Sequence, residues 1–247
     1  MLVQGGETIL NASFLPESAG GPQLEAGEVH VWAVPLHGAP EPFEALLSAA
    51  EQTKAERLRF ADHRCRFTIW RGALRAILGG YAGSEPRALE FTFGPRGKPS
   101  LLGAPLQFNL SHSAQLALVA VGRNELGVDC EKVRDFEGLE DIARRHFSAV
   151  ELAALSALAE PERPRGFYRC WTRKEAFIKA IGAGLSLPLD IFDVTIGDPA
   201  AFLAFRDGQE DPERWTLADV SPGPDYIAAL AARQRGLRVR TFALRAS

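Results

Sequence analysis

Alternating apolar and polar residues predict strands in several short stretches of the chain, because successive side chains of a strand face opposite sides. Helical periodicity predicts a helix that begins near residue 42, a long helix over 62–78, a helix from residue 148 to about 158 and a second long helix over 167–181. Residues 1–27 are rich in Gly, Pro, Ser and Glu and show little periodicity. The predicted strands span residues 28–35, 89–93, 106–110, 115–121, 126–131, 191–196, 215–220 and 226–232.

Capping and turn residues set the expected ends of these helices. Thr53–Glu56 and Ser148–Glu151 both have the form of a capping box, which satisfies free N–H groups at a helix start. Gly79-Gly80 is expected to end the first long helix, and Gly182-Ala-Gly184 the second. The Ser111-His-Ser segment is expected to form the turn between two of the predicted strands.

The order of the predicted elements repeats along the chain, since a long helix followed by three strands occurs twice. We therefore expect an α+β fold of two similar halves, residues 1–124 and 125–247, related by pseudo-twofold symmetry. Each half would pack a long helix on a small antiparallel sheet, with the active site in the cleft between the halves. Coincidence among short α+β patterns is the competing interpretation.

Composition narrows the class of protein. Lys and Arg (28) nearly balance Asp and Glu (31), and the net charge of −3 gives no general field that would attract nucleic acid or an anionic membrane. The three cysteines, Cys65, Cys130 and Cys170, show neither a CxxC pair nor a metal-ligand spacing. We find no signal peptide and no apolar run of about 20 residues. These features favour a soluble, cytoplasmic protein.

Two carboxylates stand out in the segment Gly127-Val-Asp-Cys-Glu131. On a strand, Asp129 and Glu131 would point to one side, while Val128 and Cys130 would face the core. Two carboxylates held together repel unless a cation lies between them, and Mg²⁺ prefers such oxygen ligands. Taken alone, the segment is more typical of an acidic, solvated strand end.

A second group of chemical residues lies on the helix predicted over 167–181. Trp171, Glu175 and Lys179 recur every four residues and therefore share one face. Glu175 would add a third carboxylate to a metal site, and Lys179 could stabilise a transferred phosphate or act in proton transfer. The simpler alternative is a surface ion pair between Glu175 and Lys179.

These segments, together with two upstream motifs, resemble the 4′-phosphopantetheinyl transferase superfamily. Gly-Val-Asp-Cys-Glu is followed some forty residues later by Phe-Tyr-x-Cys-Trp-Thr-Arg-Lys-Glu-Ala-Phe-x-Lys-Ala, as is typical of the family. Gly97-Lys-Pro99 and Phe108-Asn-Leu-Ser-His-Ser113 precede them in the expected order. The resemblance covers about residues 50–195 and is to the larger, pseudo-dimeric type of the family. Cys130 departs from it, because a branched aliphatic residue is more usual there.

The resemblance implies a role for each matching residue. Asp129, Glu131 and Glu175 would ligate magnesium, or manganese, that also holds the diphosphate of coenzyme A. Lys179 would assist at the transferred phosphate, and Glu175 is the protein base that we expect. The residues implied to lie along coenzyme A are Arg57, Arg64, Lys98, Pro99, Ser111, His112 and Lys179, with Arg66 as a weaker match beside the first two.

The implied reaction transfers 4′-phosphopantetheine from coenzyme A to a serine of an acyl or peptidyl carrier protein. Arg144, Arg145, Phe147 and the helix after Ser148 are candidates for the carrier-binding surface. The client pathway stays open among fatty-acid, polyketide, nonribosomal-peptide and lysine metabolism, and we expect a monomer. The alternatives are another metal-dependent phosphoryl-transfer enzyme and a coenzyme A- or carrier-binding module without catalysis.

Overall fold

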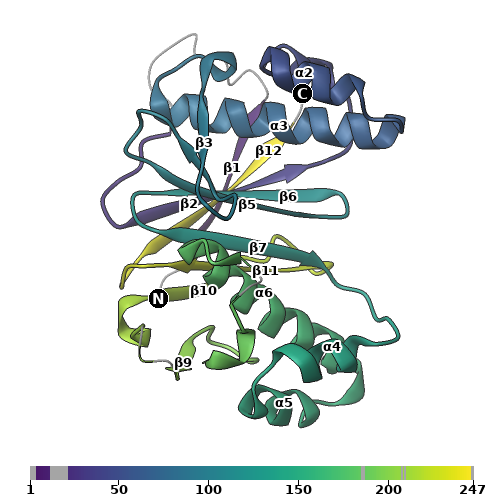
Figure 1. The fold of residues 1–247 in the computed structure, drawn as a ribbon, viewed down its shortest axis with the longest axis vertical. Helices are drawn as coiled ribbons and strands as arrows, with labels where there is room; N and C mark the ends of the chain where they lie inside the picture. The colour runs from purple at the N-terminus through teal and green to yellow at the C-terminus, as the bar shows by residue number, and fades with distance from the viewer. Residues whose placement is uncertain (1–3, 12–21, 185–186, 207, 209, 246–247) are drawn as a thin grey trace.

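The structure is a computed structural model that describes residues 4–11, 22–184, 187–206, 208 and 210–245. The long helix α3 (Ala61–Ala82), a five-stranded sheet, a three-stranded sheet and the long helix α6 (Arg163–Ile181) lie in four successive layers (Figure 1). Buried apolar side chains fill each of the spaces between the layers. The expected α+β class is confirmed.

The two sheets differ in size and in strand direction. The larger sheet is mixed, because β12 runs parallel to both of its neighbours and the other pairs are antiparallel. Its strands are, in order, β1 (Gln4–Asn11), β12 (Arg238–Arg245), β2 (Glu28–Pro35), β6 (Leu116–Gly122) and β5 (Gln107–Ser113). The smaller sheet is antiparallel, in the order β10 (Thr216–Asp219), β11 (Tyr226–Ala232), β7 (Leu126–Lys132). The C-terminal strand thus lies in the sheet of the first half.

Alternation along the strands divides their side chains between two layers. On β2, Trp32 and Val34 pack toward α3, whereas Val29 and Val31 pack between the two sheets. Strand β6 divides its side chains in the same way. The two-residue period of the sequence therefore predicts these central strands well, since both faces of the sheet are covered.

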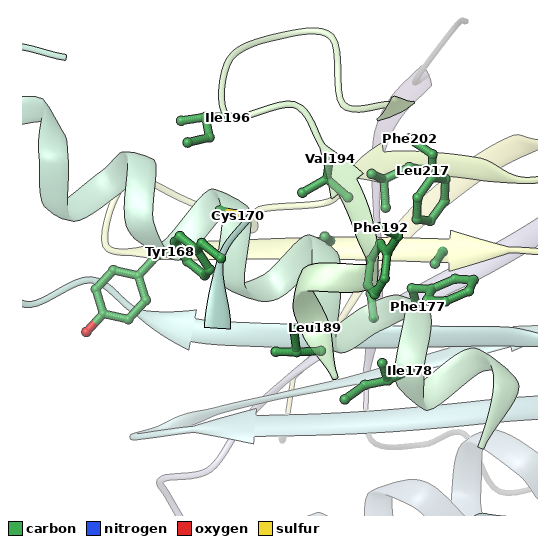
Figure 2. Packing of buried hydrophobic residues seen from close by; sticks show 14 of the residues in the cluster. Tyr168, Cys170, Phe177, Ile178, Leu189, Phe192, Val194, Ile196, Phe202 and Leu217 are labelled. Atoms are coloured by element: carbon green, nitrogen blue, oxygen red, sulfur yellow. The ribbon is translucent and has the colours of Figure 1, made fainter. Parts of the chain in front are cut away.

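The helix on the far side of the smaller sheet rests on an aromatic core. Phe177 of α6 lies 4.8 Å from Phe192 and 4.9 Å from Trp215 between ring centroids, and Phe202 packs beside them (Figure 2). Such close aromatic pairs each contribute about 0.5–1.5 kcal/mol beyond their area. This aromatic core sets the distance between α6 and the smaller sheet.

Several expected boundaries were wrong; α6, for example, begins at Arg163 rather than at residue 167. The capping box of helix α2 (Ala49–Glu56) is formed by Ser48 and Glu51, not by Thr53–Glu56, which lies inside the helix. Helix α3 continues through Gly79-Gly80 and ends at Gly83, whose φ of 61° is the left-handed conformation that glycine adopts freely. The Ser111-His-Ser segment belongs to β5 rather than to a turn. The second capping box, Ser148 with Glu151, and the helix end at Gly182 are confirmed.

The remaining elements are short. Two small hairpins, β3 (Phe91–Phe93) with β4 (Pro99–Leu101) and β8 (Phe192–Val194) with β9 (Phe202–Phe205), flank the main sheets. The strands β4, β9 and β12 and the helix α4 are additions to the sequence prediction, whereas β1 agrees with an irregular strand, one of two interpretations of residues 1–27. Within the described residues, the other helices include α1 (Glu41–Glu44), α4 (Leu139–His146), α5 (Ala149–Ser156) and the 3₁₀ turns Pro86–Ala88, Glu160–Glu162, Leu189–Ile191 and Pro212–Arg214.

Each half contains a buried ion pair in a similar setting. In the first half, Glu51 of the capping box binds Arg75 of α3, which also donates to the Pro86 and Leu89 carbonyls. In the second half, Glu151 of the capping box binds Lys174 of α6 at 2.8 Å, and Lys174 also donates to the carbonyls of the 189–192 segment. This correspondence agrees with two related halves, while the pseudo-twofold symmetry stays a prediction.

Two further expectations concern the cysteines and membrane-spanning helices. Cys65, Cys130 and Cys170 are all free thiols. Among the described residues, no helix combines the length and the apolar character that crossing a membrane requires.

Candidate functional site

Strand β7 presents its carboxylates on the side away from the inter-sheet core. Val128 and Cys130 are fully buried between the two sheets, as the sequence predicted. Asp129 and Glu131 alternate with them, so their side chains project from the opposite face, on which α6 lies. Asp129 is buried at 4% exposure, whereas Glu131 is half-buried.

A glycine allows β7 to lie directly against α6. A Cβ atom at Gly127 would lie 2.1 Å from the Ala176 carbonyl oxygen and 2.4 Å from the Ala180 nitrogen. No side chain fits there, so the strand backbone touches the helix backbone. This contact brings the carboxylates of β7 next to the face of α6 that carries Glu175 and Lys179.

Lys179 joins the helix to the strand. Its ammonium forms an ion pair of 2.6 Å with Asp129 Oδ1 and donates to Ser111 Oγ at 3.1 Å. An ammonium has three donors, and the side chain is 30% exposed, so one N–H remains for a ligand. Lys179 is therefore a member of the site and not of a surface pair with Glu175.

Glu175 lies close to this group in a largely dry position. It is 9% exposed, and burial raises the pKa of its carboxyl to about 7, with Asp129 and Glu131 adding to the rise and Lys179 opposing it. Among the described residues it has no hydrogen-bond or ion-pair partner. Burial also raises the pKa of Glu131, although the hydrogen bond from Ser113 works in the other direction.

The chemistry of these carboxylates fits a hard divalent cation. Asp129 Oδ2 is buried and has no hydrogen-bond partner. Leaving a buried acceptor unpaired costs about 1–3 kcal/mol, and this oxygen is available to a cation in addition to the bond that Asp129 Oδ1 accepts from Lys179. In the described part of the chain, however, no three His, Cys, Asp or Glu side chains are close enough together to hold a metal ion. The donor set fits magnesium, and its convergence on an ion stays a proposal.

Comparisons with known proteins agree with this arrangement. The family model of the 4′-phosphopantetheinyl transferase superfamily matches residues 125–231, which include β7 and α6. The 4′-phosphopantetheinyl transferase HetI of Nostoc sp. strain PCC 7120 is 38% identical over 218 residues, covering 84% of this chain and 89% of the relative. The Sfp transferase of Bacillus subtilis strain 168 is 31% identical, over 76% and 78% of the two chains.

The chain belongs to the 4′-phosphopantetheinyl transferase superfamily. It is therefore an enzyme of that transferase class, and coenzyme A is the substrate that the family uses. The two motifs on β7 and α6 lie within the matched region. The extent of the similarity to HetI agrees with the resemblance drawn from the sequence motifs.

The transferase's remaining candidate residues come from the first half. Arg57, at the C-terminal end of α2, and Arg64, on the first turn of α3, are exposed and form no ion pair with any residue that the structure describes. His112 is exposed on β5, with its ring 5.9 Å from Trp70. Pro99 begins β4. None of these residues contacts the carboxylates directly.

The Lys98 ammonium is bonded to backbone carbonyls, whereas a lysine that contacts coenzyme A would direct its ammonium to a phosphate. Its ammonium donates to the Leu126 carbonyl at 3.2 Å and to the Ala180 carbonyl. Burial lowers the pKa of this ammonium. In the described structure, Lys98 therefore connects the β3–β4 hairpin to the start of β7 and the end of α6. Its contact with coenzyme A stays a prediction.

Sequence reasoning missed two polar residues of the site, Asn109 and Ser113. Ser113 Oγ donates to Glu131 Oε2 at 2.7 Å, and Asn109 Oδ1 accepts from the Val128 amide at 3.0 Å. Both flank Ser111, which donates to Asp129 Oδ1 at 2.8 Å. The signal that could have found them is the period-two series of polar residues at positions 109, 111 and 113, which alternates with the apolar residues Phe108 and Leu110.

The second half also has a groove that lies apart from these residues. Its lining comes from residues 135–164 and includes Glu140, Arg144 and Arg163, but none of the candidate catalytic or metal residues. Phe147, which we expected on the carrier-binding surface, is only 4% exposed and packs 5.3 Å from the Phe167 ring. That expectation was wrong, because Phe147 belongs to the core beneath α6.

Proposed function

We propose that this transferase moves 4′-phosphopantetheine from coenzyme A to a serine of an acyl or peptidyl carrier protein, with magnesium at the β7–α6 site. The family membership supports the reaction class. The observation that carries the site is the approach of Asp129, Glu131, Glu175 and Lys179, with Asp129 Oδ2 buried and unpartnered. Most buried side-chain polar atoms have a hydrogen-bond partner, so an unpartnered carboxylate oxygen supports a cation at this position.

In this proposal, Asp129, Glu131 and Glu175 hold the magnesium. Bound there, it would neutralise the diphosphate and stabilise negative charge on the phosphate oxygens. All three side chains supply the oxygen ligands that this ion prefers. Manganese would fit the same ligands.

The reaction forms a bond between the carrier serine Oγ and the β-phosphorus of coenzyme A. It breaks the bond from that phosphorus to the oxygen of adenosine 3′,5′-bisphosphate, which leaves. Glu175 is the proposed acceptor of the serine proton, directly or through a water, because its carboxylate has no hydrogen-bond or ion-pair partner among the described residues. Lys179 has one free N–H to donate to the transferred phosphate.

The two halves would divide this work. Residues 1–124 would bind the nucleotide end of coenzyme A through exposed cations such as Arg57 and Arg64, and residues 125–247 would supply the metal and proton-transfer groups. The cleft between the halves would then contain the coenzyme. For the carrier, Arg145 and the α5 helix remain candidates, whereas Arg144 already pairs with Asp141 at 2.6 Å.

The test compares Glu175→Ala and Lys179→Ala with Glu137→Ala, an exposed carboxylate outside the site. Conversion of an apo carrier to its holo form is followed by intact mass, and coenzyme A binding by calorimetry. We expect the first two variants to lose about 10²–10⁴-fold in the rate of conversion, as is typical when an acid–base or charge-stabilising group is removed. Glu137→Ala should match the wild type.

The alternative of a binding module predicts a different outcome. The wild type would bind coenzyme A without converting any of several carriers, and Glu175→Ala would bind it equally well. A hydrolase, in contrast, would release 4′-phosphopantetheine in the absence of a carrier. Either result would contradict the proposed transfer.

A further inference from the structure

Strands β5 and β7 lie next to each other although they belong to different sheets. Each is the last strand of its own sheet. Such an edge strand normally exposes unpaired N–H and C=O groups along one side. In this protein, side chains from the first half satisfy that side of β7.

The contacts repeat at every second residue of β7. Three of its amides donate to β5 side chains: Val128 N to Asn109 Oδ1 at 3.0 Å, Cys130 N to Ser111 Oγ at 3.3 Å, and Lys132 N to Ser113 Oγ at 3.1 Å. The Leu126 carbonyl accepts from Lys98 Nζ at 3.2 Å. We call this series of side-chain bonds, made by Lys98, Asn109, Ser111 and Ser113, the β5–β7 seam.

Two members of the seam also hold a carboxylate. Ser111 donates to Asp129 Oδ1 at 2.8 Å, and Ser113 donates to Glu131 Oε2 at 2.7 Å. A hydroxyl has a single proton, so each serine directs that proton to the carboxylate while its oxygen accepts a β7 amide. Each carboxylate is thereby tied to the backbone one residue further along its own strand. The bond fixes both the position of the strand and the orientation of the side chain.

We propose that the β5–β7 seam aligns Asp129 and Glu131 for the divalent cation, and that Ser113 is the positioning residue for Glu131. This inference rests on the proposed magnesium site. Neither Asn109 nor Ser113 has a charge of its own to offer a metal or a phosphate. Their contribution is through the strand and the carboxylate that they hold. Hydrogen-bond partners of metal ligands commonly change metal affinity by about 10–100-fold when they are removed.

The test measures the binding of Mn²⁺ to the full chain by electron paramagnetic resonance. We expect Ser113→Ala to weaken binding by about tenfold, with the KM for coenzyme A little changed. Ser113→Thr keeps the hydroxyl and suits a strand, so it should restore binding. Ser221→Ala is the matched control, because Ser221 Oγ also accepts a strand amide, that of Ala228, without touching a carboxylate.

Equal Mn²⁺ affinity for Ser113→Ala and the wild type would overturn the proposal, as would an equal loss in Ser221→Ala. Absence of Mn²⁺ binding by the wild type would refute the metal site and with it the positioning role. The seam itself is measured separately by hydrogen exchange. Asn109→Ala should speed exchange of the Val128 amide relative to that of Ala228, and unchanged exchange would show that no such seam exists in solution.

Discussion

Replacing Gly127 by alanine tests whether the close contact between β7 and α6 positions the residues of the site. The new Cβ would lie 2.1 Å from the Ala176 carbonyl oxygen and 2.4 Å from the Ala180 nitrogen, both in the backbone of α6. Backbone atoms cannot rotate away as a flexible side chain can, so the strand and the helix must separate. Restoring ordinary contact between carbon and oxygen requires a displacement of about 1 Å.

This displacement would act on stability and on activity to different degrees. Overpacking of this kind costs about 1–3 kcal/mol, which lowers the melting temperature by about 2–12 °C for a chain of this size. A misplacement of about 1 Å between reacting groups costs about 100-fold in rate. Since the contact lies between the strand of Asp129 and the helix of Glu175, we expect kcat/KM to fall by roughly that factor even in the folded protein.

The assay follows carrier conversion at a temperature well below the melting point of the variant, so that unfolding does not contribute. Gly223→Ala is the control, because a Cβ at that position meets nothing within 4 Å. Wild-type kcat/KM in Gly127→Ala would refute the view that the β7–α6 distance sets the site. A lowered melting temperature with unchanged kcat/KM would also refute that view, because the added Cβ would then disturb the packing without affecting catalysis.

Two other predictions concern buried charges. Lys174→Met should lower the free energy of unfolding by about 3–5 kcal/mol in a denaturant titration, because Glu151 would keep a buried charge without its cation; the simultaneous change Glu151→Gln removes that charge and keeps an amide oxygen that can accept from the Val194 amide, so it should recover part of the loss, and no recovery would contradict the pairing. For Glu175, the folded state raises the pKa from 4.5 to about 7, so its ionisation lowers stability as pH rises through this range. With metal chelated, Glu175→Gln should therefore melt above the wild type at pH 8 and close to it below pH 4.5, and the reverse order would contradict the raised pKa.

Local sequence patterns predicted the elements whose two faces are both covered. The period-two strands around Val31 and Val119 and the long helices were evident, because burial on fixed faces dictates their composition. The capping box that starts α2 was not predicted, because the pattern was assigned to Thr53–Glu56 alone. Ser48–Glu51 and Thr53–Glu56 match the pattern equally well, and the first forms because Glu51 also binds Arg75, 24 residues further along the chain.

Pairing between segments that are distant in the sequence accounts for most of the other differences between the sequence prediction and the structure. Strand β12 lies parallel to β1 and β2, whose residues are more than two hundred positions away, and no local signal specifies such a partner. The charged members of the site could be found from their spacing on one strand and one helix. The Ser111-His-Ser segment was assigned to a turn because its serines are polar, yet their partners are the amides and carboxylates of β7. The two-residue spacing of these polar residues indicates a strand, but only the long-range fold identifies the strand that they bind.

The most direct test of the central claim is the intact mass of an apo carrier protein incubated with this transferase and coenzyme A. Two carriers are compared, one with its acceptor serine and one with alanine in its place, each with magnesium or with a chelator. The account predicts a gain equal to one 4′-phosphopantetheine group only for the serine carrier with magnesium present. A gain on the alanine carrier, or an equal gain in the chelator, would contradict it.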